Sequence, residues 1–121
     1  MLDHLIVTVA DFDASRRFYL EALKPLGYQV VLEMGRAVGL GIDGKPEFFI
    51  REGDAVSPPI HLAFRSPDRQ QVDDFYEAAI RAGGRDNGPP GLRTGYHPNY
   101  YGAFVIDPDG HNIEAVCHRE C

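Results

Sequence analysis

Glu114 is the residue whose place in the sequence most clearly suggests chemistry. It follows an Asp-Pro-Asp-Gly segment at 107–110, which is typical of a tight turn between two strands. In the strand expected after this turn, Ile113 and Ala115 belong to a small apolar row, and Glu114 lies on the opposite face. If that face is buried, the carboxylate needs a cation or a metal ion as its partner, because an unpaired buried charge is costly. If the face is exposed, Glu114 is an ordinary surface residue.

Two histidines occupy matching places in an internal repeat. When the sequence is aligned with itself at an offset of 57 residues, an ungapped window of 24 residues contains seven identities. The identical pairs are His4/His61, Leu5/Leu62, Asp11/Asp68, Phe18/Phe75, Tyr19/Tyr76, Ala22/Ala79 and Gly27/Gly84. This agreement indicates that the chain contains two copies of one structural unit.

The first copy predicts the order of elements that must position these side chains. Polar and apolar residues alternate over 4–9 as in a strand, and a helix is expected from about 12 to 23. Three short strands are expected at 28–34, 37–42 and 47–51, since turn residues separate them. The unit is therefore a strand, a helix and three further strands.

The second copy repeats this order with an insertion. A strand begins at His61, a helix begins near Asp68, and the last two strands flank the turn at 107–110. The Gly- and Pro-rich stretch 87–98 is expected to form the insertion, and Ser-Pro-Pro at 57–59 a stiff linker between the copies.

The alignment extends to the last strands if Asp43-Gly44 is matched with Asp109-Gly110. Phe48 then stands at the position of Glu114. The equivalent positions of the two copies hold three potential metal ligands and one apolar residue: His4, Phe48, His61 and Glu114. A slip of one residue would bring Glu47 to this position and make it a fourth ligand.

Two imidazoles and one carboxylate on three strands form a set of ligands that suits non-haem Fe(II), with Mn, Ni or Zn as other divalent ions. Taken singly, a histidine is more often a core or surface residue than a ligand. The shared register of His4 and His61 favours the metal site. We therefore predict that His4, His61 and Glu114 bind one divalent metal ion and leave positions open for a substrate.

Further polar aromatic residues gather in the segment before the penultimate strand. They are Tyr96, His97, Tyr100 and Tyr101. Because loops held by a rigid sheet often carry functional groups, His97 or Tyr101 is a candidate acid or base beside Glu114. Ordinary packing of an aromatic loop on the sheet accounts for these residues equally well.

Length and composition indicate one domain, residues 1–121, with module 1 at about 1–56 and module 2 at about 59–121. The net charge of −6 argues against a nucleic-acid partner, since phosphate binding needs clustered Lys and Arg. The sequence contains no long apolar run or signal peptide, so we expect a cytoplasmic protein without membrane contact and with a small-molecule partner. Cys117 and Cys121 are expected to be free thiols.

Taken together, these motifs resemble the vicinal oxygen chelate superfamily, which includes glyoxalase I, extradiol dioxygenases, fosfomycin-resistance proteins and bleomycin-binding proteins. The resemblance covers the whole chain through the repeated unit, the Phe-Tyr pair in each helix and the DPDGHNIE motif at 107–114. It implies an α+β fold of two tandem βαβββ modules, whose curled mixed sheets enclose a cleft with a metal ion at its floor.

The resemblance does not select one reaction. Glyoxalase I has four ligands, two of them glutamates, and Phe48 stands where the first glutamate is expected. Extradiol dioxygenases have two histidines and one glutamate at these positions, but Phe104 stands in place of their tyrosine. The fosfomycin-resistance enzymes also use two histidines and one glutamate, yet their basic phosphonate- and potassium-binding loop has no match here. The bleomycin-binding relatives need no metal.

We therefore expect a metal-dependent lyase of the glyoxalase kind, or a dioxygenase, that chelates a small substrate through two oxygens. The alternative is a metal-independent protein that binds a drug or antibiotic, with aromatic side chains as the walls of its cleft. These side chains are Phe48, Phe104, Tyr100 and Tyr101. A homodimer is expected in either case, because relatives are commonly dimers and curled sheets with apolar faces leave surface that one chain does not cover.

Overall fold

The computed structural model describes residues 1–54 and 58–119. The first module consists of β1 (Leu5–Val9), α1 (Phe12–Leu23), the short 3-10 helix η1 (Lys24–Leu26), β2 (Gln29–Glu33), β3 (Ala37–Ile42) and β4 (Lys45–Glu52). The second consists of β5 (His61–Arg65), α2 (Arg69–Arg81), β6 (Arg85–Leu92), β7 (Tyr101–Ile106) and β8 (Asn112–Cys117). Cys117 is a buried free thiol, whereas Ser57 and Cys121 lie outside the described residues.

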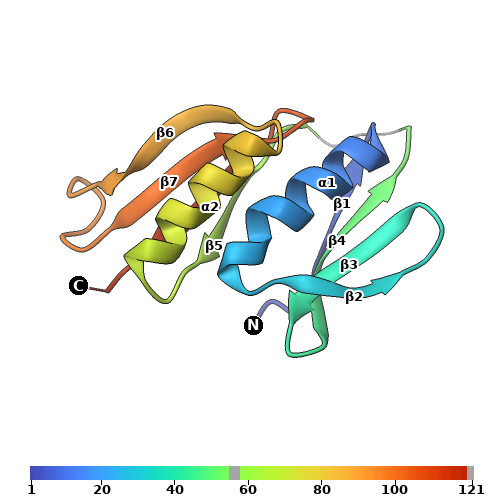
Figure 1. Cartoon of the computed structure of the whole chain (residues 1–121), viewed down its shortest axis with the longest axis horizontal. Coiled ribbons are helices and arrows are strands. Elements are labelled where there is room, and N and C mark those ends of the chain that lie inside the picture. Colours follow the sequence, from blue (N-terminus) through green and yellow to red (C-terminus); the bar gives the residue numbers. More distant parts are fainter. Residues whose placement is uncertain (55–57, 120–121) are drawn as a thin grey trace.

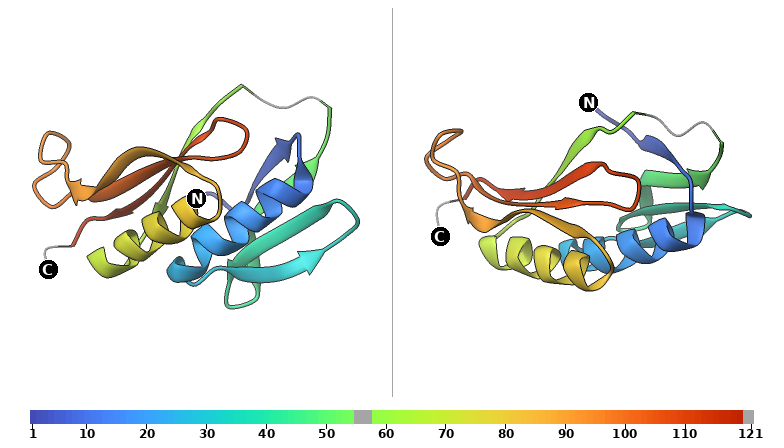
Figure 2. Two further views of the ribbon diagram at one scale, coloured as in Figure 1. Left: turned by 45° about the horizontal axis from the view of Figure 1, so that its top comes forward. Right: turned by 90° about the horizontal axis from the view of Figure 1, so that it is seen from above.

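Each module forms one four-stranded mixed sheet, with the order β1-β4-β3-β2 in the first and β5-β8-β7-β6 in the second. The first strand of each module pairs in parallel with the last, and the other neighbours are antiparallel. The predicted tandem βαβββ modules are thus confirmed (Figure 1). The two sheets do not close on one another, and both helices lie on the same side of the two sheets (Figure 2).

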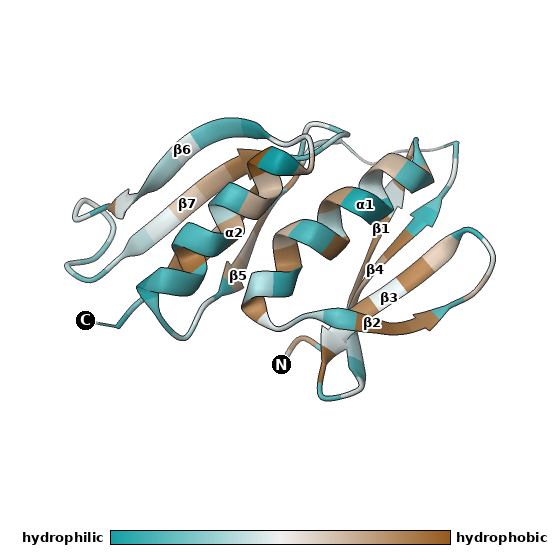
Figure 3. Cartoon of the chain, in the orientation of Figure 1, coloured by the Kyte–Doolittle hydropathy of each residue, from teal (hydrophilic) through white to brown (hydrophobic). Residues whose placement is uncertain are grey.

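Both helices begin at an aspartate cap and bury one apolar face. The side chain of Asp11 accepts a hydrogen bond from the N–H of Ala14, and the equivalent Asp68 caps α2 in the same way. Phe18 on α1 and Phe75 on α2 are fully buried, as the repeat suggested. Hydrophilic residues alternate with hydrophobic ones along each helix, which marks their exposed and buried faces (Figure 3). Within the described residues, no helix is long and apolar enough to cross a membrane.

β6 corrects the prediction that residues 87–98 form an insertion. Residues 85–92 pair with β7, and the register shifts on both sides of Gly88. Proline cannot donate to a sheet ladder, but β6 is the outer strand of its sheet, where Pro89 and Pro90 are tolerated. Tyr101 is therefore the first residue of β7 and not part of a loop.

The strand register also corrects the residue matched with Glu114. Glu114 pairs with Ala63 on β5, and the repeat places Ala63 at Ile6, whose partner on β4 is Phe49. Phe49, and not Phe48, is thus the equivalent of Glu114. The two modules differ in the length of the turn before their last strands, so an alignment on Asp-Gly is displaced by one residue. A bulge beside Gly41, where Glu47 has no strand partner on β3, contributes to this displacement of one residue.

A buried hydrogen bond joins the two modules. Tyr19 on α1 is fully buried, and its hydroxyl donates to Asp107 in the turn between β7 and β8. The other carboxylate oxygen of Asp107 accepts hydrogen bonds from the N–H groups of Asp109 (2.9 Å) and His111 (2.8 Å). Burial, together with the charge of Asp107, raises the pKa of Tyr19 well above its ordinary value, so the hydroxyl remains a donor.

We expect the substitution Tyr19→Phe to lower the free energy of unfolding by about 1–3 kcal/mol, because it leaves a buried carboxylate oxygen without a donor. Chemical denaturation measures this change. Tyr28→Phe is the matched control, since the Tyr28 hydroxyl donates over 3.0 Å to Glu47 in a half-exposed place where water can substitute. Equal losses in the two variants would contradict the structural role of the Tyr19–Asp107 bond.

Candidate metal-binding site

Glu114 is fully buried on β8, and both of its carboxylate oxygens have partners. Oε1 lies 2.7 Å from Nε2 of His61, and Oε2 accepts a hydrogen bond from the hydroxyl of Tyr100. No lysine or arginine forms an ion pair with Glu114 in the part of the chain that the structure describes. A buried carboxylate is costly unless it is paired, and a cation bound beside His61 would compensate its charge.

Strand pairing and small residues explain why these groups meet. β5 and β8 are parallel neighbours, so His61 lies on the same face of the sheet as Glu114 and its direct strand partner Ala63. On the other side of β8, Gly102 pairs with Val116. A Cβ at Gly102 would lie 3.3 Å from Oε2 of Glu114 and 3.2 Å from the Tyr100 ring. Glycine at this position therefore leaves Tyr100 its path to the carboxylate.

Tyr100, and not Tyr101, contacts Glu114 in the structure. Phe104 pairs directly with Glu114, and strand alternation from Phe104 places Gly102 and Tyr100 on the same face. This alternation could have identified Tyr100 from the sequence, but only if the strand was known to begin as early as Tyr101. Burial, followed by the hydrogen bond to Glu114, raises the pKa of Tyr100 above its ordinary value. At neutral pH, Tyr100 is thus a protonated donor to the carboxylate.

Tyr101 and His97 lie away from the carboxylate. The hydroxyl of Tyr101 donates over 2.7 Å to Asp73 on α2, and burial together with this contact raises the pKa of Tyr101 to about 12. Nδ1 of His97 accepts a hydrogen bond from the N–H of Asn99 (3.2 Å). The His97 ring contacts His118 at 5.8 Å between centroids, and the His118 ring lies 5.3 Å from that of Tyr100. His97 is therefore connected to the site through these rings and through its carbonyl, which accepts the N–H of Tyr100 over 3.1 Å.

His4 precedes β1 on the other sheet and is exposed. Its Nδ1 lies 2.7 Å from a carboxylate oxygen of Asp3, and its ring packs edge-on against Phe49 at 5.7 Å. The hydrogen bond to His4 lowers the pKa of Asp3. In the described residues of one chain, His4 does not join His61 and Glu114 in a group of ligand atoms within 4.8 Å of one another.

A different group of potential ligands surrounds the turn before β8. Ligand atoms of Asp107, Asp109 and His111 lie within 4.8 Å of one another, a spacing that could hold a metal ion. However, Asp107 already accepts the turn hydrogen bonds described above. Nδ1 of His111 accepts the N–H of Ile60 at 3.0 Å, which puts the proton of a neutral imidazole on Nε2. This pattern is typical of a group that holds the turn in place.

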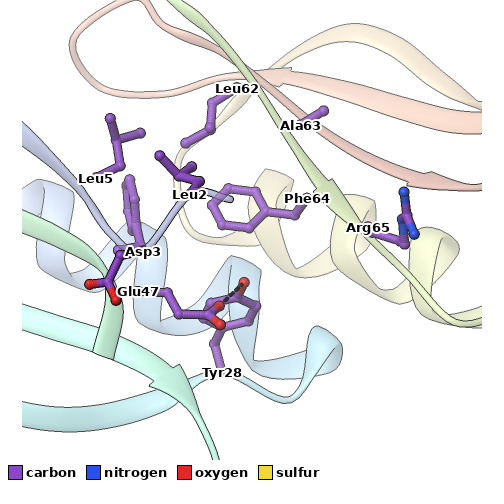
Figure 4. Close-up of a pocket in the computed structure, with 10 residues that line it drawn as sticks. Leu2, Asp3, Leu5, Tyr28, Glu47, Leu62, Ala63, Phe64 and Arg65 are labelled. Atoms are coloured by element: carbon purple, nitrogen blue, oxygen red, sulfur yellow. Dashed lines mark hydrogen bonds between the residues drawn. The ribbon is translucent and has the colours of Figure 1, made fainter. Parts of the chain in front are cut away.

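The side chain of Glu47 lies in a separate pocket of about 200 Å³ between the modules (Figure 4). There its carboxylate accepts the hydroxyl of Tyr28, beside the ring of Phe64. The pocket contains neither His61 nor Glu114. Because His61, Tyr100 and Glu114 lie together outside this pocket, we regard the face of the second sheet that carries them as the candidate site.

The residues at this face fit a divalent cation. An imidazole nitrogen and a carboxylate oxygen are common ligands of Fe, Mn, Ni and Zn, and the buried charge of Glu114 would be compensated by the ion. Two ligands in one chain leave coordination positions for a third protein ligand and a substrate.

Comparison with known proteins agrees with this fold. The model of the Glyoxalase/Bleomycin resistance protein/Dioxygenase superfamily matches residues 1–115, and the chain belongs to this superfamily. The chain is similar to a glyoxalase/bleomycin resistance protein from Albidiferax ferrireducens T118, with 28% identity, a TM-score of 0.84 and 99% of each chain covered.

Two further relatives extend this agreement. The uncharacterized protein YqjT of Bacillus subtilis (strain 168) is 28% identical over 95% of this chain and 97% of its own length. A glyoxalase-related enzyme from Fulvimarina pelagi shares the fold at 22% identity, with a TM-score of 0.73 and coverage of 97% and 87% of the two chains. The resemblance recognised in the DPDGHNIE motif and the repeat is thus confirmed.

Proposed function

We propose that this protein is a metal-dependent enzyme that chelates a small substrate through two neighbouring oxygens. The observation that carries this proposal is the buried Glu114 carboxylate, held between His61 and Tyr100 without a lysine or arginine partner among the described residues. A core built only for stability gains little from such an arrangement, since replacing buried ionic groups by apolar ones is often neutral or stabilising.

We further propose that His4 completes the metal site from a second copy of the chain in a homodimer. His4 is exposed beside Phe49 on the face of the first sheet that lacks a helix. The same face carries Ile6, which is 48% exposed. An apolar surface of this kind favours burial against another chain, and a twofold axis would form two identical sites.

The residues of the chain have distinct roles in this proposal. A bound divalent ion would act as a Lewis acid that polarises two substrate oxygens. The Tyr100 hydroxyl orients the Glu114 carboxylate through its hydrogen bond and is a proton donor beside it. We therefore assign to Tyr100 the acid role first considered for Tyr101. His97 remains a candidate acid or base at the edge of the site.

The experiment that tests the function uses two reactions on the full-length protein. Oxygen uptake is followed for the Fe(II) protein with a panel of catechols, and hemithioacetal turnover is followed with Ni(II), Zn(II) or Mn(II). We expect turnover in one assay, its loss in Glu114→Gln and its retention in Tyr101→Phe.

Binding of small aromatic ligands that survives both chelation and Glu114→Gln, with no turnover under any metal, would contradict the enzyme. That result would favour the metal-independent binding protein instead.

A further inference from the structure

Arg93 lies beside the proposed metal site and carries no ion pair with any described residue. It follows the end of β6, and its guanidinium contributes to a polar hollow of about 370 Å³ that also includes His61. The other lining residues are Asn87, Gly88, Tyr96, Phe104 and Asn112. Arg16 and Arg36 pair with carboxylates on the surface, but no Asp or Glu in the described part of the chain pairs with Arg93.

Ring contacts connect Arg93 to the site. Its guanidinium carbon lies over the Phe104 ring, 5.4 Å from the centroid, and this ring lies 6.0 Å from that of His61. The N–H of Arg93 donates over 2.7 Å to the carbonyl of Tyr100, so both residues stand at the base of one loop. The Arg93 guanidinium and the Tyr100 hydroxyl, which donates to Glu114, thus belong to the same loop.

Local packing holds the guanidinium in place. Nη2 donates over 2.7 Å to the carbonyl of Pro89. A Cβ at Gly88 would lie 3.2 Å from Nη2, and a Cβ at Gly91 would lie 3.1 Å from Nη1, so the glycines leave this space to the side chain. With the described residues, the guanidinium of Arg93 makes one hydrogen bond although it has five N–H donors, and the remaining donors can receive a ligand.

We propose that Arg93 binds a carboxylate of the substrate, whose two neighbouring oxygens occupy the metal site. This inference rests on the proposed function and narrows it to small acids that contain both groups. The planar guanidinium matches a carboxylate in two parallel hydrogen bonds, and its stacking on Phe104 fixes its plane. The chain has a net charge of −6 and therefore repels an anionic ligand. The positive charge of Arg93 would offset this repulsion at the site.

The test compares two probes of nearly equal size that differ in one charge, 3,4-dihydroxybenzoate and its methyl ester. Calorimetric titration gives the dissociation constant of each probe with the Zn(II)-loaded full-length protein. We expect the wild type to bind the acid about tenfold or more tightly than the ester, as a charge-assisted hydrogen bond allows. Arg93→Gln should bring this ratio close to one while ester binding is retained. Arg93→Lys, which keeps the charge, should retain part of the preference.

Arg17→Gln is the matched control, because it removes one positive charge from an exposed position on α1 and should keep the wild-type ratio. A preference for the acid over the ester that persists in Arg93→Gln would overturn the inference. An Arg93→Gln variant that no longer forms a dimer but keeps the wild-type ratio of the two dissociation constants would overturn it as well. Ester binding that is unaffected by Glu114→Gln would instead contradict the chelation on which the proposed function depends. The two failures are therefore distinguishable.

Discussion

The substitution Glu114→Gln is expected to weaken binding of a divalent metal ion by about 100-fold or more. Loss of a residue that only supports a ligand already costs about 10–100-fold in metal affinity, and loss of the ligand itself should cost at least as much. Competition of the protein with a chelator of known affinity, using Mn(II), Fe(II), Ni(II) and Zn(II), measures the change.

The stability of Glu114→Gln distinguishes a ligand from a structural residue. Glutamine has nearly the same shape and removes a buried charge, so the metal-free variant should unfold within about 1 kcal/mol of the wild type. Glu47→Gln is the matched control, because Glu47 bonds to Tyr28 in the other pocket and should leave metal affinity unchanged. A large loss of stability in Glu114→Gln with unaltered metal binding would contradict the assignment.

Phe18→Ala is expected to lower the free energy of unfolding by about 3–5 kcal/mol, the usual range for deletion of a buried aromatic ring. Phe18 is fully buried on α1 and packs edge-on against Tyr19 at 4.9 Å. It also reaches the second module, since a Cβ at Gly84 would lie 2.7 Å from its ring. A loss of this size is a large part of the stability of a domain of this length.

Chemical denaturation followed by two probes tests this prediction. Because the Phe18 ring contacts both modules, we expect them to unfold together in one transition in the wild type and in the variant. Arg17→Ala on the exposed side of the same helix should change stability by no more than about 0.5 kcal/mol. Separate transitions for the two modules, or a small loss in Phe18→Ala, would contradict this description of the core.

The repeat made most of the fold predictable from the sequence. Identical pairs such as Phe18/Phe75 and Asp11/Asp68 occupy matching core and cap positions, so the pattern of one module supported that of the other. The meeting of His61 and Glu114 was also predictable. Both positions follow from strand alternation in neighbouring strands, which is a local rule.

The errors arose where a local pattern does not determine strand pairing. Pro89 and Pro90 argue against a strand, but they are compatible with an outer strand, and the sequence does not reveal which strand is outermost. The choice of Tyr101 over Tyr100 followed from the uncertain start of β7, because a shift of one residue exchanges the two faces. The bulge that leaves Glu47 unpaired displaced the match of Glu114 in the same way.

The distance between His4 and the other two predicted ligands could not be predicted from the repeat. The repeat aligned His4 with His61, but this alignment specifies equivalent places in two modules and not their distance. In one chain, the two sheets remain open and the three predicted ligands are not gathered. Assembly of two chains is therefore the central element of the proposed site.

Mixing two inactive variants tests this element most directly. His4→Ala and Glu114→Gln should each lose tight metal binding as homodimers. In a mixed dimer, the Glu114→Gln chain supplies an intact His4 and the His4→Ala chain supplies an intact Glu114, so one of the two sites is complete. After random exchange of chains at equal concentrations, half of the dimers are mixed, and about a quarter of the wild-type tight-binding sites should return. Return of no tight sites, although the mass of the mixed dimer is observed, would contradict a site shared between two copies.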